Sequence, residues 1–277
     1  MFFFPFIITK KTHYNSFSKV IVYFITYLIP EFFILFFMNY YNHTLNFNVI
    51  PIFLISIFSF VNCYEVGYIY NECETIKKEK EPSKRLKDSD LEYYEKHKII
   101  IYLTRLIFSF VLNCFLLFFI DVKSILLFSL FEVITLIVFF IYNNIRGPYT
   151  QIVYFFLCCL KYSSILFVFS NSISIEAFLS AIFVLPLLRI IEYKAHYGLN
   201  SNVNVFFRKY VIKYDVSKIP LFRVIGTFSL FLLCLILKLF QLLNMFPAII
   251  TFYMFLYRIS LFFAEKIGIK FKGYLQR

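Results

Sequence analysis

Charged residues, glycine and tryptophan are scarce in this sequence. Of its 277 residues, 16% are charged, 6 are glycine and none is tryptophan, whereas 61% are hydrophobic and the mean hydropathy is +0.76. A soluble domain carries about 25% charged and about 45–50% apolar residues. A soluble protein could not cover this much apolar surface, and a disordered chain would not contain it. The composition therefore excludes both classes.

The absence of tryptophan qualifies the excess of the other aromatic residues. Phe and Tyr have AT-rich codons and Trp does not, so a nucleotide bias accounts for part of the 41 Phe and 22 Tyr. We therefore do not interpret the phenylalanines as a binding device.

The six cysteines show neither a CxxC motif nor a Cys/His spacing typical of zinc sites. They are interpreted as small apolar packing residues, which also excludes a disulfide scaffold.

The apolar residues form continuous runs, and this arrangement indicates the architecture. A membrane β-barrel alternates apolar and polar residues, whereas a spanning helix needs about 20 consecutive apolar ones. The sequence predicts an all-α, polytopic membrane helical bundle that forms a single integral membrane domain over residues 1–277. We expect about eight spans, with nine as the alternative. The eight lie at residues 20–38, 49–70, 99–120, 124–142, 150–170, 173–191, 219–243 and 245–264. The apolar stretch 1–9 is too short to span, resembles no signal peptide, and is expected to be interfacial or re-entrant.

The basic residues predict the orientation of these spans. Of 28 Lys and Arg, 24 lie in segments that the span model places on one face: 1–19, 71–98, 143–149, 189–223 and 258–277. By the positive-inside rule, both termini and the two long loops, 71–98 and 192–218, are cytoplasmic. The net charge of +12 then reflects topology and contact with anionic lipid headgroups. No nucleic-acid partner is expected, because the basic residues are divided among loops that border a membrane.

The first long loop holds the strongest candidate site. Four carboxylates fall within ten residues, at Glu72, Glu74, Glu79 and Glu81. Glu72, Thr75 and Glu79 have the 3 and 4 spacing that places them on one helix face. Mg²⁺ binds through one or two carboxylates plus substrate phosphates, and Lys84 and Arg85 could meet the remaining phosphate oxygens. The alternative is a solvated loop whose lysines neutralise its carboxylates.

This loop resembles a divergent copy of the first motif of UbiA-type intramembrane prenyltransferases. That motif has Asn-Asp at the end of the second span, further Asp at 3 and 4 spacing, then Pro and Arg-Pro-Leu. Asn71 matches the Asn, while Glu72 and Glu79 stand for the first and third Asp. Pro82 and Arg85, followed by leucine, fit the tail. Thr75 occupies the place of the middle Asp, which is a loss of charge.

Two further segments bear on the resemblance. Tyr142 to Pro148 resembles the family's Tyr-Thr/Ser-x-Leu-Lys-Arg turn after the fourth span, with Arg146 in the place of the phosphate-binding Lys. An arginine in a cytoplasmic turn is otherwise a topology marker.

The family's second Asp-rich motif follows the sixth span. There this chain has neither the aspartates nor the glycine of the motif, and Glu192 is the one carboxylate in a position to serve as a metal ligand. His196 follows four residues later. The family usually has nine spans, against eight here.

The resemblance implies an activity. It implies Mg²⁺-dependent transfer of an isoprenyl group from a polyprenyl diphosphate to an unknown acceptor, in the bacterial inner (cytoplasmic) membrane. The implied metal ligands are Glu72, Glu79 and Glu192, and the implied catalytic residues are Glu72, Glu79 and Arg146. The implied diphosphate site consists of Asn71, Lys84, Arg85, Arg146 and Tyr142. Two alternatives stay open: a catalytically degenerate lipid-binding or assembly protein, and a transporter or polysaccharide-export component. Spans broken by Gly or Pro would favour a transporter, and a chain with only 6 glycines gives this alternative little support.

Ionisable residues within or near the spans form a separate group: Glu31, Glu65, Arg105, Glu132, Lys161 and Glu176. Each costs about 2.5–3.5 kcal/mol or more at bilayer depth, so each is expected to face a cavity or a partner. Arg105 and Glu132 lie on neighbouring antiparallel helices at depths that differ by about 9 Å. A direct pair and a shared aqueous cavity are both open for them. Glu65, with Asn62, either lines the same cavity as Glu72 or makes helix–helix contacts.

Overall fold

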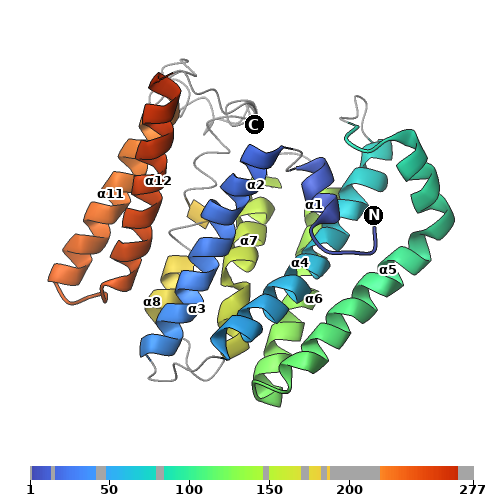
Figure 1. Ribbon diagram of the computed structural model, residues 1–277, viewed down its shortest axis with the longest axis horizontal. Helices are drawn as coiled ribbons and strands as arrows, with labels where there is room; N and C mark the ends of the chain where they lie inside the picture. The colour runs from blue at the N-terminus through green and yellow to red at the C-terminus, as the bar shows by residue number, and fades with distance from the viewer. Residues whose placement is uncertain are drawn as a thin grey trace. The chain divides into compact units, whose positions relative to one another are not determined.

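The computed structural model describes residues 2–13, 16–41, 48–78, 84–145, 150–169, 175–181, 186–187 and 219–267. These residues form helices joined by turns, and no strand occurs among them, which confirms the all-α class (Figure 1). Six of the helices are long and apolar enough to cross a membrane, so the chain is an integral membrane protein. The chain divides into two compact units, each described separately below: Met1–Tyr23 with Glu31–Ile173, and Phe24–Pro30 with Ser174–Arg277.

Six expected spans have counterparts among the described helices. The helical stretches that could cross a membrane are Phe17–Phe37, Val49–Lys78, Asp88–Leu116, Val122–Asn144, Pro220–Leu239 and Phe246–Ala264. The fifth expected span corresponds to α7 (Thr150–Ser163) and the 3₁₀ helix η3 (Ser164–Phe169) that follows it. The apolar helical stretch at this place, Ile152–Val168, is shorter than the six stretches named above. Most of the sixth, 173–191, lies outside the described residues, apart from α8 (Ile175–Leu179) and short flanking pieces. The count of eight therefore stays a prediction.

The first spanning stretch is interrupted near a proline. It begins with α2 (Phe17–Tyr23), continues as a π-helical turn, η1 (Phe24–Leu28), and ends as α3 (Ile29–Tyr41). Pro30 has no N–H to donate, and its ring would clash with a carbonyl one turn earlier in a regular α-helix. The wider π-turn directly before Pro30 accommodates that ring without breaking the span.

The first unit is built around α4 (Val49–Cys73), which packs against both α5 (Asp88–Leu116) and α6 (Val122–Asn144). The close approach of α4 and α6 requires Gly67, because a Cβ there would lie 2.2 Å from the Cγ atom of the Phe139 ring. Tyr64 packs edge-on against the same ring, with centroids 4.8 Å apart. A short 3₁₀ helix, η2 (Thr75–Lys78), follows α4. Both helix ends that carry the candidate motifs are thus fixed by packing.

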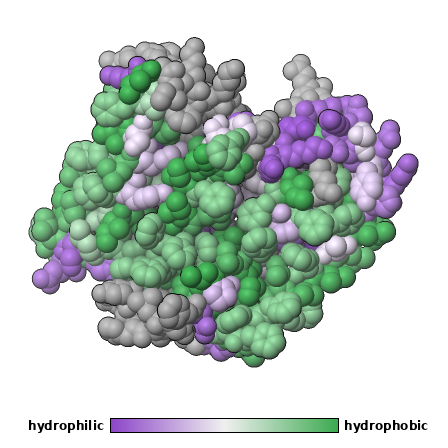
Figure 2. Space-filling view, viewed as in Figure 1, coloured by the Kyte–Doolittle hydropathy of each residue, from purple (hydrophilic) through white to green (hydrophobic). Residues whose placement is uncertain are grey.

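The outer face of α5 is apolar and exposed. Ile99, Leu103, Ile107 and Phe110 all lie on it. Figure 2 shows hydrophobic residues along this helix and hydrophilic residues gathered over the end where it begins. Exposed apolar side chains over the length of a span are expected to contact lipid tails. The hydrophilic end carries the loop that contains the first candidate motif.

The turn between α5 and α6 is capped by Asp121. Its Oδ2 atom accepts a hydrogen bond from the Ser124 backbone N–H at 3.0 Å, and its Oδ1 atom accepts one from the Ser124 hydroxyl at 2.8 Å. These two hydrogen bonds hold the pKa of Asp121 below its ordinary value. A carboxylate at this position satisfies an N–H group at the start of α6 and complements the helix dipole.

The second unit contains a helical hairpin of α11 (Ile219–Leu239) and α12 (Phe246–Lys266), side by side and antiparallel in Figure 1. Aromatic rings fill the contact between the two helices: Phe228 lies 5.1 Å from Phe255, and Phe231 lies 5.0 Å from Phe252, between centroids. α12 also packs against α8, and the Tyr253 hydroxyl donates a hydrogen bond to the Ile25 carbonyl of η1 at 2.8 Å.

Candidate functional site

The structure brings two of the predicted site residues together at the end of α4. The Glu72 side chain is 3% exposed, and its Oε1 atom accepts a hydrogen bond from Arg85 Nη1 at 2.7 Å. Arg85 lies just before α5, so this ion pair ties the end of α4 to the start of α5. The same Nη1 atom is 3.3 Å from Nε2 of His13, at the end of α1 (Ile7–Thr12). The predicted metal ligand and a predicted phosphate ligand therefore face each other.

The other charges of this loop neutralise one another. Glu74 accepts hydrogen bonds from the Tyr94 hydroxyl at 2.8 Å and from Lys77 Nζ at 3.0 Å, and Lys77 also pairs with Glu95. Lys84, predicted to bind diphosphate, donates to Asp88 at 3.3 Å, and both side chains are largely exposed. Salt bridges like these, at the surface, contribute little to stability. This part of the loop fits the alternative of a solvated, internally neutralised segment.

The second motif ends α6 directly beside the first. The Asn143 amide donates to the Gly67 carbonyl of α4 at 3.1 Å, and Lys78 Nζ donates to Asn144 Oδ1 at 3.2 Å. The Tyr142 ring packs against Tyr154 of α7, with centroids 5.8 Å apart. Two segments that are distant in the sequence and that both resemble family motifs are thus in contact.

Three predicted site residues, Glu79, Arg146 and Glu192, lie outside the described residues. Each of the two motifs nevertheless contributes one buried oxygen. Neither Thr75 Oγ1 nor Asn143 Oδ1 has a hydrogen-bond partner in the described part of the chain. Buried polar atoms in proteins nearly always have a partner, so both oxygens are suited to accept a ligand.

These oxygens give a partial fit to Mg²⁺. The Glu72 carboxylate, Thr75 Oγ1 and Asn143 Oδ1 are all oxygen donors, the type of ligand that hard cations such as Mg²⁺ prefer. Within the described ranges, no three Asp, Glu, His or Cys side chains lie close enough together to hold a metal ion. Mg²⁺ at this place would therefore depend on substrate phosphates for its other ligands.

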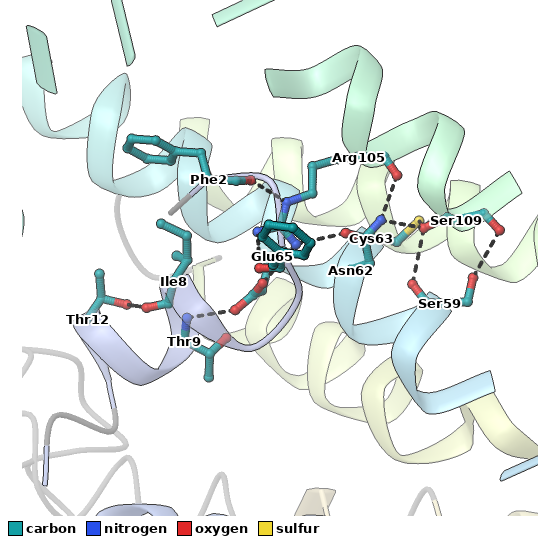
Figure 3. A network of polar contacts seen from close by, with 11 residues as sticks. Phe2, Ile8, Thr9, Thr12, Ser59, Asn62, Cys63, Glu65, Arg105 and Ser109 are labelled. Carbon is teal, nitrogen blue, oxygen red and sulfur yellow. Dashed lines mark hydrogen bonds and ion pairs between the residues drawn. The ribbon is translucent and has the colours of Figure 1, made fainter. Parts of the chain in front are cut away.

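A second polar cluster lies inside the bundle, around Arg105 of α5 (Figure 3). The Arg105 and Glu65 side chains are both 0% exposed and form an ion pair, with Nη1 2.9 Å from Oε2. Nη1 also donates to Asn62 Oδ1 at 2.8 Å. A buried charge is tolerated when it is paired and hydrogen-bonded in this way. Arg105 thus pairs with Glu65 of α4 and not with Glu132, so Glu65 makes helix–helix contacts.

The N-terminal segment supplies the remaining partners of this pair. Arg105 donates to the Phe2 carbonyl at 2.6 Å and to the Phe4 carbonyl at 2.8 Å, while Glu65 Oε1 accepts from the Thr9 backbone N–H at 2.7 Å. Residues 2–12 are therefore held against α4 and α5 by backbone hydrogen bonds. Sequence reasoning missed these contacts because backbone carbonyls and N–H groups carry no residue-specific signal.

Lys161 lies within α7, in the same unit. Its Nζ atom lies 5.1 Å from the centroid of Tyr23 and 5.3 Å from that of Tyr64. Cation–π contacts of this kind stabilise a lysine away from water. Glu31 of α3 is fully buried and interacts electrostatically with Lys161. The side chain of Glu176 lies outside the described residues.

Apolar spanning helices with buried polar clusters define an integral membrane protein of the helical class. Comparison with known proteins found no matching family model, no matching curated protein and no matching solved structure. The resemblance to UbiA-type prenyltransferases therefore rests on the residues of the two motif segments.

Proposed function

We propose that this protein binds a polyprenyl diphosphate where α4 and α6 end and transfers its isoprenyl group to an acceptor in the membrane. The observation that carries the proposal is the contact between the two motif segments, in which Lys78 donates to Asn144. The oxygens of Thr75 and Asn143, which have no hydrogen-bond partner among the described residues, lie in these same segments and support it. A diphosphate seated at a membrane surface needs both cationic donors and oxygen ligands for a cation, and the segments contain both.

The residues divide into two roles in this proposal. Arg146, with Lys84 or Arg85, holds the diphosphate through charge-assisted hydrogen bonds, and Asn71 and Tyr142 complete its polar surroundings. The carboxylates of Glu72, Glu79 and Glu192 serve as metal ligands. Mg²⁺, when bound, neutralises the charge that develops on the leaving diphosphate.

The chemistry of the transfer follows from the apolar surroundings. The bond between the isoprenyl carbon and the diphosphate oxygen breaks, and the electron pair leaves with the diphosphate. The acceptor then bonds to the allylic carbon and releases a proton. Aromatic residues near these helix ends, such as Tyr64, Tyr68 and Phe139, exclude water and can stabilise an allylic cation through their ring faces.

The proposal places the site on the cytoplasmic face of a bacterial inner membrane. Within the first unit, Lys11 pairs with Asp90 at 2.6 Å, and Lys78 contacts Asn144. Three of the basic segments predicted to be cytoplasmic therefore meet at one end of the unit, which supports a common side for them.

The experiment uses membranes that contain the full-length protein, because the acceptor is unknown and membranes supply candidates. A polyprenyl diphosphate labelled in its prenyl chain is added with Mg²⁺, and transfer of the label to a new product is followed. We expect transfer with the wild type, loss with Glu72→Gln, and wild-type transfer with Glu92→Gln, a control on the exposed face of α5. Equal transfer with Glu72→Gln would overturn the role of Glu72.

A second function is favoured by one observation. The ion pair between Glu72 and Arg85 joins a predicted metal ligand to a predicted phosphate ligand and so occupies both. This arrangement suits a catalytically degenerate protein that binds or presents a prenyl lipid. Such a protein would retain the labelled diphosphate in a saturable complex and transfer none of its label, with or without Mg²⁺.

A further inference from the structure

Glu132, near the middle of α6, joins three helices through its carboxyl group. It is 4% exposed. Its Oε1 atom is 2.7 Å from the Ser59 hydroxyl of α4, and its Oε2 atom is 2.7 Å from Nδ2 of Asn113 on α5. The Ser59 hydroxyl is in turn 2.8 Å from Asn113 Oδ1, which closes a ring of three contacts. Neither of the proposed motif segments takes part in this ring.

The ring needs one hydrogen more than an ionised Glu132 allows. Each of its three contacts is at hydrogen-bond distance and requires one hydrogen. Ser59 supplies one, and the Asn113 amide supplies one to Glu132, since its other N–H points to Ser129 Oγ at 3.0 Å. The third hydrogen must therefore be carried by the Glu132 carboxyl.

Exchanging the amide oxygen and nitrogen of Asn113 does not change this result. In that orientation the amide nitrogen donates to Ser59, and Ser59 donates to Glu132 Oε1. The amide oxygen then faces Glu132 Oε2 at 2.7 Å, and two acceptors at this distance require a proton between them. Both orientations demand a protonated carboxyl.

The charged and titratable groups around Glu132 do not replace the missing proton. On α4, Glu65 is engaged with Arg105 of α5, and the Cys63 thiol, which Glu132 influences electrostatically, donates to Ser109. On α7, Lys161 lies over two tyrosine rings, and η3 carries no titratable residue. No Lys, Arg or His in the described part of the chain pairs with Glu132.

We propose that Glu132 is a proton-binding site inside the bilayer. The neutral acid donates through Oε1 to Ser59, Ser59 donates to Asn113, and Asn113 donates back to Oε2, so the ring is complete. Loss of the proton opens the ring by placing two acceptors against each other, and it leaves an unpaired charge where α4, α5 and α6 meet. The site thus makes this three-helix contact sensitive to protonation. The inference is independent of the proposed transferase function.

Infrared spectroscopy of the full-length protein in lipid nanodiscs tests the proton directly. At neutral pH we expect a carbonyl band of a protonated carboxylic acid that shifts in heavy water and decreases in Glu132→Gln. The matched control, Glu95→Gln, removes a carboxylate that is ion-paired with Lys77 and is expected to leave this band unchanged. A Glu132→Gln spectrum without a loss in this band would overturn the proposal.

Thermal unfolding in detergent provides a second test. The folded protein holds a proton that the unfolded chain releases above the ordinary Glu range, so the wild-type Tm falls as pH rises towards neutrality. Glu132→Gln donates and accepts at the same two places and is expected to fold, with this component of the pH dependence removed. Failure of Glu132→Gln to fold, or an unchanged pH dependence, would contradict the proposal. A Tm that rises with NaCl but not choline chloride, in wild type alone, would show a sodium site and overturn it too.

Discussion

Arg105 and Glu65 form an ion pair in which both side chains are removed from solvent, with Nη1 2.9 Å from Oε2. The pair joins α4 to α5 and, through the Phe2 carbonyl, also holds the N-terminal segment. Breaking a buried pair from one side leaves an uncompensated charge, which costs far more than the loss of a surface pair. Substitutions at Glu65 and Arg105 test the two functions of this pair separately.

Glu65→Gln is expected to lower the free energy of unfolding by about 3–5 kcal/mol, because Arg105 keeps its charge without a counter-ion. Unfolding in mixed detergent micelles measures the effect. The matched control is Glu95→Gln, which removes the same charge from a half-exposed pair with Lys77 and should cost at most about 1 kcal/mol. Equal stability losses in the two variants would contradict the assignment of a buried pair.

Arg105→Lys is expected to release the N-terminal segment. Lysine keeps the charge beside Glu65 but lacks the planar set of donors that reaches Phe2 and Phe4 as well. Hydrogen–deuterium exchange should become faster in residues 2–12, including the Thr9 amide that donates to Glu65. Exchange in the hairpin of α11 and α12 serves as the internal reference. Unchanged protection of residues 2–12 would show that other contacts hold the segment.

Gly67→Ala is expected to destabilise the contact between α4 and α6 by about 1–3 kcal/mol, because the new methyl group would overlap the Phe139 ring. The matched control is Gly226→Ala on α11, where no atom of the described residues, apart from the nearby backbone of α11 itself, lies within 4 Å of the new Cβ. There the same change should be neutral or stabilising by up to about 1 kcal/mol. Thermal unfolding of both variants makes the comparison, and a harmless Gly67→Ala would contradict the close approach.

Asp121→Ala is expected to cost about 1 kcal/mol, since α6 loses its N-cap. The lowered pKa of Asp121 adds a pH dependence. Because the folded carboxyl has a pKa below its ordinary value of 3.8, its stabilising effect is present above that value and is lost as pH falls through the folded pKa. The difference in Tm between wild type and Asp121→Ala should therefore shrink in acid, and a constant difference would contradict the assignment.

The positions of the helices could largely be predicted from the sequence. The expected spans 49–70 and 124–142 correspond closely to α4 (Val49–Cys73) and α6 (Val122–Asn144). α5 begins at Asp88, ahead of the apolar span expected from residue 99, because the helix has a polar first third. The sequence Ser89-Asp90-Leu91-Glu92, which is typical of a capping box, indicates a helix start at this place. The π-turn before Pro30 was not predicted, since an internal proline can be accommodated in several ways.

The partners in the polar contacts were harder to predict from the sequence. Sequence reasoning identified Glu65, Arg105 and Glu132 as residues that need partners, because charges inside a bilayer are costly. It could not choose among the partners, since that choice depends on the rotation of each helix about its axis. Arg105 pairs with Glu65, and Glu132 bonds to the neutral residues Ser59 and Asn113. Motif residues Glu79, Arg146 and Glu192 stay predictions.

We propose that the ends of α4 and α6 form one diphosphate site. Equilibrium binding to purified protein, with Mg²⁺, of a polyprenyl diphosphate and of the corresponding polyprenol tests it without knowledge of the acceptor. We predict that the diphosphate binds at least about tenfold more tightly, a difference of about 1.4 kcal/mol, and that Glu72→Gln removes this preference. Equal affinity of the wild type for the two lipids would contradict the claim.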